Sequence, residues 1–198
     1  MAGVFINYRT GDGHQLAAAL NRELRRKFGD DRVFLDSTSL PPGRPFPPEL
    51  ERRLIESNVL LVLIGPNWLT VRNEAGERRI DEPTDYVAYE IRRSLERQIL
   101  VLPVLLDDTP RPDARQLPSD IAVLVSHQEC NLRSRHLDRD LAELVRILSG
   151  HVPGASGADA ARPEPPRRKD PVATKIKVGR GIVQGDHSSA TYNEGREP

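Results

Sequence analysis

The stretch VLLVLI at residues 59–64 decides the fold class. A short run that is apolar on both faces is typical of a strand inside a parallel sheet. Further runs of this kind occur at 4–7, 33–35, 99–106 and, more weakly, 121–126. Amphipathic helical patterns alternate with them at 13–28, 47–57, 85–98 and 139–149. The alternation predicts a three-layered α/β fold, in which helices cover both faces of a parallel sheet.

The residue counts restrict the classes of binding partner and the cellular compartment that we expect. Lys plus Arg and Asp plus Glu both number 29, so no global positive charge is available to hold a nucleic acid or an anionic membrane. Cys130 is the only cysteine, which excludes an intrachain disulfide and suits a reducing compartment. The first residues contain no basic leader, and the longest apolar run is far shorter than the roughly 20 residues that cross a bilayer. We therefore expect a cytoplasmic protein.

The chain changes in composition after residue 149. Residues 150–171 are rich in Pro, Gly, Ala and charge and have no periodic apolar face, which predicts a flexible linker. From 172 to 198 the composition shifts to β-branched residues, Gln, Asn, Thr and spaced glycines. The sequence thus predicts a domain at 1–149, a linker at 150–171 and a separate, disordered tail at 172–198.

Several common chemistries are excluded by the loops that follow the strands, where open α/β sheets bind their ligands. The segment YRTGDGHQL at 8–16 lacks both the dinucleotide-binding and the phosphate-loop glycine patterns. A magnesium-dependent receiver domain needs acidic residues where Asn7 and Gly65 stand. The five histidines are scattered and lack companion cysteines, so we expect no metal site.

Five segments in order resemble the TIR (Toll/interleukin-1 receptor) domain family. They are VFINYR (4–9), VFLDSTSLPPGRPF (33–46), VLLVLIGPNWL (59–69), DYVAYEIRRSL (85–95) and ILVLPVLL (99–106). Each is weak alone, but their order makes the assignment strong over residues 3–149. The resemblance implies a flavodoxin-like five-stranded parallel sheet in the order 2-1-3-4-5. It also implies that the domain forms homo-oligomers.

Glu90 is the catalytic candidate. Some TIR domains cleave NAD⁺ at the nicotinamide–ribose bond with one glutamate on the helix after the third strand, and DYVAYEI is similar to that segment. Nicotinamide leaves as a neutral base, so no second carboxyl group is needed to protonate it. One carboxylate can stabilise the positive charge that develops on the ribose. Without the resemblance, the pattern favours a solvated surface residue paired with Arg93.

The same resemblance supplies the substrate-binding candidates. Tyr86 stands at the aromatic position four residues before Glu90 and offers a flat face to nicotinamide. Arg9 and Thr10 match positions that touch the dinucleotide, although Arg9 also fits a plain surface charge. Phe46 belongs to the loop that rims the pocket in the family. Trp68 fits either a wall of the site or ordinary core. NAD⁺ is expected as substrate, with no cofactor.

The tail segment IKVGRGIVQGDHSSATYN (176–193) resembles short amyloid-forming signalling motifs related to the RIP homotypic interaction motif. Stacked copies would bury Ile182 and Val183 and align Gln184 in hydrogen-bonded ladders. An upstream receptor with a like segment would then crowd tethered domains together through residues 172–198. We expect a bacterial-type immune or cell-death effector that hydrolyses NAD⁺ when it assembles. The alternatives are a non-enzymatic TIR adaptor that only recruits partners and a domain that binds the nucleotide without turnover.

Overall fold

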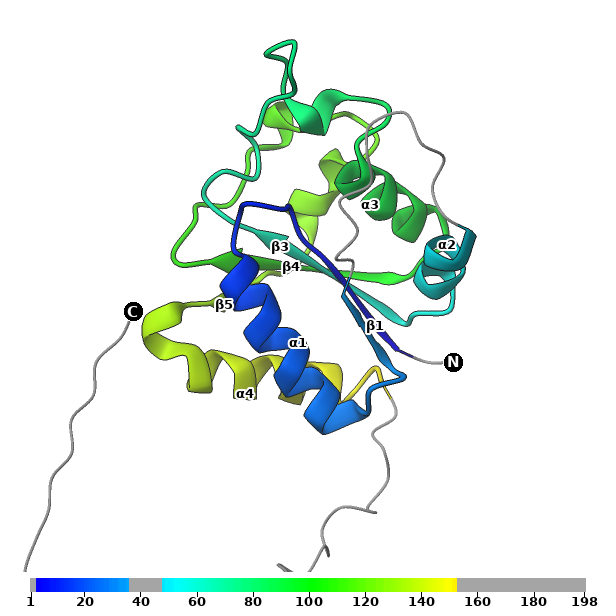
Figure 1. The fold of residues 1–198 in the computed structure, drawn as a ribbon, viewed down its shortest axis with the longest axis vertical. Helices are drawn as coiled ribbons and strands as arrows, with labels where there is room; N and C mark the ends of the chain where they lie inside the picture. Colours follow the sequence, from blue (N-terminus) through cyan, green and yellow to red (C-terminus); the bar gives the residue numbers. More distant parts are fainter. Residues whose placement is uncertain (1–2, 36–47, 153–198) are drawn as a thin grey trace, which may run out of the picture. The chain divides into compact units, whose positions relative to one another are not determined.

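The computed structural model describes residues 3–35 and 48–152, which form a five-stranded sheet between helices (Figure 1). All neighbouring strands pair in parallel, in the order β2-β1-β3-β4-β5. This confirms the predicted fold class and strand order. The strands are β1 (Val4–Asn7), β2 (Val33–Leu35), β3 (Val59–Ile64), β4 (Leu100–Leu106) and β5 (Cys130–Leu132).

Two apolar cores lie on opposite faces of the sheet, because alternate strand residues point to opposite sides. Val4 and Ile6 of β1 belong to the core that α1 (His14–Phe28) and α4 (Leu137–Leu148) cover. Phe5 belongs to the other core, under α2 (Pro48–Ile55) and α3 (Tyr86–Glu96). Figure 1 shows α1 and α4 together on one side of the strands and α2 and α3 on the other.

Helix α3 begins at Tyr86 because Asp85 caps it. The Asp85 carboxylate accepts a hydrogen bond from the Ala88 backbone N–H at 2.9 Å, which satisfies one of the donors that a first turn leaves unpaired. Val87 and Ile91 bury the inner stripe of the helix against the sheet, as their spacing predicts. The cap and the stripe together fix which way each α3 side chain points.

The fifth strand was predicted in the wrong place. Residues Ala122–Ser126 form the 3₁₀ helix η3, and β5 lies further on, at Cys130–Leu132. Ile121 and Leu124, three residues apart, are buried, whereas Val123 is 51% exposed, which is a helical rather than an alternating pattern. Shorter 3₁₀ turns are η1 (Arg79–Asp81), η2 (Ala114–Gln116) and η4 (Ser134–His136).

Some predictions fall outside the described residues. They concern the loop at 36–47, which includes Phe46, and the residues from 153 onward, which include most of the predicted linker and all of the tail. Within the described ranges, none of the helices combines the length and the apolar character needed to span a membrane.

Candidate functional site

Glu90 lies against the carboxyl end of β1. Asn7 ends this strand and shares a face with Phe5, two residues earlier, so its side chain points toward α3. The Asn7 amide nitrogen donates a hydrogen bond of 2.6 Å to Oε2 of Glu90 and a longer one, 3.3 Å, to the Val87 carbonyl oxygen. Glu90 is only 1% exposed. Its carboxylate therefore lies at the rim where a doubly wound sheet binds ligands, and not in the outer solvent layer.

Arg9 and Asp85 form a buried ion pair beside this contact. Both terminal nitrogens of Arg9 donate to the Asp85 carboxylate, at 2.8 and 3.1 Å, and both residues are 1% exposed. Arg79 lies further off, with Nε 3.8 Å from the same carboxylate. The two-pronged geometry is the strongest form of ion pair between these side chains.

This ion pair connects the loop after β1 to the start of the catalytic candidate's helix. The Asp85 carboxylate accepts hydrogen bonds from both Arg9 and the Ala88 N–H, so it caps α3 and also holds this helix to the β1 loop. The sequence predicted Arg9 as a substrate contact, whereas the described geometry directs its terminal nitrogens to Asp85. A role at the substrate stays a prediction for Arg9.

The other candidates are distributed around the same rim. Thr10 is exposed in the loop after β1, and Tyr86 is half-buried at the first position of α3, one turn before Glu90. Trp68 is 1% exposed among the core residues on the α3 side of the sheet. The sequence left Trp68 open between site wall and core, and the structure assigns it to the core.

Asp12 is a further buried carboxylate at this rim. Its Oδ1 accepts a hydrogen bond of 3.2 Å from the Asn67 backbone N–H, and it packs on Gly65, directly after β3. Burial raises the pKa of the Asp12 carboxyl above its ordinary value, while the Asn67 N–H and the Arg9 charge act in the opposite direction. A Cβ atom at position 65 would lie 2.5 Å from Asp12 Oδ1, so a larger residue there requires the Asp12 carboxylate to shift.

Three of these polar residues were missed by the sequence analysis as parts of a site. Asn7 and Asp12 entered it only as exclusions or loop residues, and Asp85 only as the first residue of the predicted helix at 85–98. The available signal for Asn7 was one polar residue at the end of an apolar strand. Nothing local signals the pairing of Arg9 with Asp85, which are 76 positions apart.

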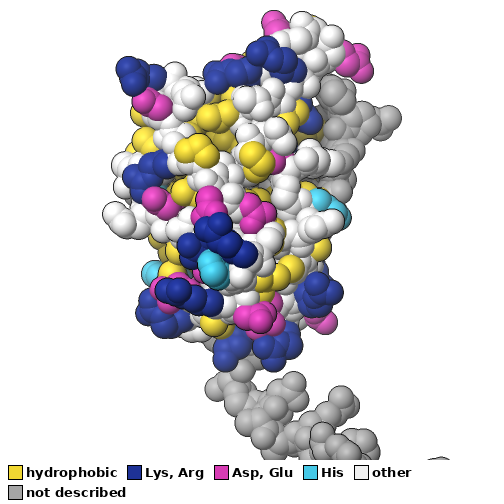
Figure 2. All heavy atoms as spheres, turned by 90° about the vertical axis from the view of Figure 1, so that its left-hand side faces the viewer, with side chains coloured by type: hydrophobic (Ala, Val, Ile, Leu, Met, Phe, Trp, Pro, Cys, Tyr) yellow, Lys and Arg dark blue, Asp and Glu magenta, His cyan; other side chains and the backbone are white. Residues whose placement is uncertain are grey.

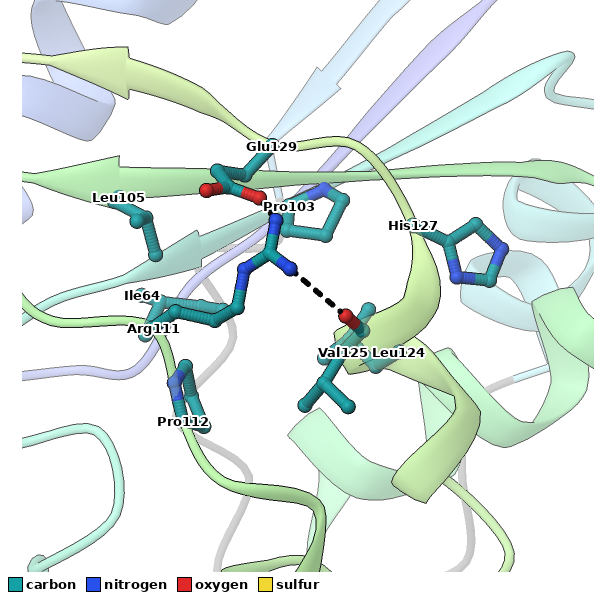
Figure 3. A pocket seen from close by; sticks show the side chains of 9 residues that line it. All are labelled: Ile64, Pro103, Leu105, Arg111, Pro112, Leu124, Val125, His127 and Glu129. Carbon is teal, nitrogen blue, oxygen red and sulfur yellow. Dashed lines mark hydrogen bonds and ion pairs between the residues drawn. The ribbon is translucent and has the colours of Figure 1, made fainter.

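The described residues also line hollows elsewhere, two of them along the sheet. One is a crevice outside the ends of β3 and β4, and its lining includes Pro66, Leu69, Thr109 and Gln116. The other lies beside β4 and is mostly apolar, with Arg111 across it and within hydrogen-bonding distance of the Val125 carbonyl oxygen (Figure 3). Glu90 lines neither of them.

The face drawn in Figure 2 carries mixed charge. Basic and acidic side chains lie next to one another on the face in Figure 2, as expected for a chain of zero net charge. Across the described ranges, no group of three or more His, Cys, Asp or Glu side chains has the geometry of a metal site. The buried polar groups described at this rim are Asn7, Glu90, Asp12 and the Arg9–Asp85 pair.

Comparison with known proteins places this geometry in a family. The chain is similar to the NAD(+) hydrolase sarm1 of Drosophila melanogaster, with 26% identity over 167 residues that cover 78% of this chain. The chain spans only 12% of that relative's length. Its fold resembles that of the TIR domains of the activated Roq1 resistosome, with a TM-score of 0.51 and 13% identity, over 74% of this chain and 98% of that one. The TIR domain family model matches residues 4–145, and the chain belongs to the TIR domain family.

Proposed function

We propose that the protein hydrolyses NAD⁺ at the bond between nicotinamide and ribose, with Glu90 as the catalytic residue. The observation that carries the proposal is the buried Glu90 carboxylate, held 2.6 Å from the Asn7 amide at the carboxyl end of β1. Similarity to a relative named as an NAD(+) hydrolase supports the substrate. The product contains ADP-ribose, and the setting is immune or cell-death signalling.

The reaction needs one anion and one water molecule. The C–N bond breaks with both electrons passing to the nicotinamide nitrogen, which leaves neutral, and positive charge develops on the ribose carbon and ring oxygen. Water then bonds to that carbon and releases a proton. A fixed carboxylate lowers the barrier because it attracts the charge that develops only as the bond breaks.

The remaining candidates orient the substrate. Tyr86, one turn from Glu90 on the same side of α3, provides an aromatic face for the nicotinamide ring. Thr10 and Arg9, in the loop after β1, contact the dinucleotide, and Phe46, outside the described residues, is a further proposed substrate contact. For Arg9 to bind a phosphate, its ion pair with Asp85 has to open or to share a donor.

Self-assembly controls the activity in this proposal. The tail at 172–198 recruits copies to a receptor or to one another, and the linker keeps the tethered domains at high local concentration. Association of the TIR domains then brings the site into its active state. The support is the composition of the tail and its separation from the domain by residues 150–171.

The test is nicotinamide release from NAD⁺ by the purified full chain over a range of protein concentrations. We expect a specific activity that rises with concentration in the wild type. The Glu90→Gln variant keeps an oxygen that can accept the Asn7 hydrogen bond but loses the charge, and we expect it to lose activity. Glu96→Gln is the matched control, since Glu96 is exposed on the same helix and pairs with Arg93.

Three outcomes would overturn parts of the proposal. Unchanged release by the Glu90→Gln variant would remove Glu90 from catalysis, and no release from the wild type at any concentration would remove the activity. A specific activity independent of concentration, and equal after deletion of residues 172–198, would remove control by assembly.

One observation favours a second candidate, a TIR adaptor without enzymatic activity. The terminal nitrogens of Arg9 already bind Asp85 and Oε2 of Glu90 already binds Asn7, an arrangement that also holds α3 to the sheet in a protein without a substrate. An adaptor predicts no nicotinamide in any variant and partner binding that Glu90→Gln leaves intact.

A further inference from the structure

Asn7 is a buried amide at the end of a strand whose other residues are all apolar. It is 0% exposed, and β1 reads Val4, Phe5 and Ile6 before it. Its backbone pairs with Val62 of β3, so the residue is fixed in the sheet and cannot swing away from α3. Burial of an amide at this position needs an explanation, because an apolar side chain is less costly there.

The contacts of the amide show which group it serves. Both acceptors that face it, the Val87 carbonyl and Oε2 of Glu90, require a nitrogen, so the amide has only one sensible orientation. The Val87 contact is 3.3 Å and fixes the plane of the amide, while the Glu90 contact is 2.6 Å and is assisted by charge. Oδ1 of Asn7, on the other side, has no hydrogen-bond partner within the part of the chain that the structure describes.

The Asn7 amide has a buried oxygen that is unpaired among the described residues, so it is poorly suited to a role in folding stability alone. Leaving a buried acceptor unsatisfied is unfavourable, so the residue does not contribute to stability through that atom. Its strong contact is the one to the carboxylate. A carboxylate that is 1% exposed in turn needs donors to keep its charge, and Asn7 provides one from the rigid end of a strand.

We propose that Asn7 is a positioning residue for Glu90: it holds Oε2 in a fixed direction at the carboxyl end of β1 and favours the charged form of the carboxylate. This deepens the proposed function and rests on it. Asn7 does not touch the reacting atoms in this account. It acts by keeping the Glu90 side chain in one rotamer when the ribose carbon becomes positive.

The first test removes the amide. Asn7→Ser takes away the long donor, and we expect kcat for nicotinamide release to fall about 10- to 100-fold with KM nearly unchanged, because the lost contact is to a charged group. The matched control is Asn58→Ser. Asn58 is exposed and precedes β3, and its side-chain amide donates to the His151 carbonyl oxygen. A kcat within about twofold of the wild type, or a change confined to KM, would overturn the proposal.

The second test keeps the shape and changes the charge. Asn7→Asp places a carboxyl group 2.6 Å from Glu90, and two carboxyl groups that share a site hold one proton to a higher pH. We expect the acidic limb of the pH dependence of kcat to move up by about one pH unit or more. Asn58→Asp adds the same charge at an exposed position and should leave this limb in place. An unmoved limb in a folded Asn7→Asp variant would contradict the proposal.

A third readout does not depend on turnover. The carbon-13 signal of the Glu90 carboxyl group can be titrated by NMR in the full chain, and we expect its midpoint to move upward in Asn7→Asp but not in Asn58→Asp. If the wild type releases no nicotinamide and this shift is still seen, the proposed function fails while the positioning contact stands. If nicotinamide is released but the midpoint is the same in all variants, the positioning role fails alone.

Discussion

The buried ion pair between Arg9 and Asp85 gives the sharpest prediction about stability. The Asp85→Asn variant keeps an oxygen for the Ala88 N–H, and Asn caps helices as well as Asp does. It removes the negative charge that holds two donors of Arg9 at 2.8 and 3.1 Å, inside a site where both residues are 1% exposed. Removing one partner of a buried pair costs about 3–5 kcal/mol, because the remaining charge is left without compensation.

That cost is a large share of the stability of a domain, which is about 5–15 kcal/mol. Urea denaturation followed by circular dichroism measures it directly. The matched control is Asp81→Asn: Arg78 grips Asp81 in the same two-pronged way, at 2.7 and 2.8 Å, but on an exposed surface. We expect the control to cost about 1 kcal/mol or less. If Asp85→Asn costs no more than Asp81→Asn, the pair does not hold α3 to the β1 loop.

Two further predictions concern Asp12 and Gly65. Because the pKa of the Asp12 carboxyl is raised, the folded protein holds the carboxyl proton more tightly than the unfolded chain does. The free energy of folding that this proton contributes is fully present below pH 3.8 and is lost as the pH rises through the folded pKa. Asp12→Asn should therefore unfold at higher urea than the wild type at pH 7, with an advantage that vanishes below pH 3.8; a less stable variant at pH 7 would refute this. Gly65→Ala places a Cβ atom 2.5 Å from Asp12 Oδ1 and should cost about 1–3 kcal/mol in the same assay. Most of that cost should disappear in an Asp12→Ala background, and strict additivity of the two substitutions would show that the contact is not its cause.

The strands that form apolar runs were predictable from the sequence. The bounds of β1, β2 and β3 match the apolar runs at 4–7, 33–35 and 59–64, because strands buried on both faces admit few polar residues. The fifth strand was predicted in the wrong place, and β4 limits how long the real strand can be. Pro103 has no N–H to offer a neighbour, and the pairing between β4 and β5 starts after it, at Val104 and Cys130. The resulting three-residue edge strand has Asn131 at its centre, so, unlike the equally short but apolar β2, it leaves no apolar run in the sequence.

The candidate site was only partly predictable. Glu90 could be singled out because a resemblance named its position, and its helix followed from the spacing of its apolar residues. The network around it could not be foreseen, since Asn7 and Glu90 are 83 positions apart and Arg9 and Asp85 are 76 apart. Contacts of that kind depend on which strand lies under which helix, and only the folded sheet supplies that information.

The central claim is that the Glu90 carboxylate faces the ribose of a dinucleotide bound at the carboxyl end of β1. The most direct measurement is a crystal structure of the Glu90→Gln variant of the full chain with NAD⁺. We predict that the side-chain amide at position 90 keeps its oxygen on Asn7 and places its nitrogen within about 3–4 Å of the ribose next to nicotinamide. A dinucleotide bound elsewhere, or a side chain at position 90 that still points only at Asn7 with the ribose out of reach, would contradict it.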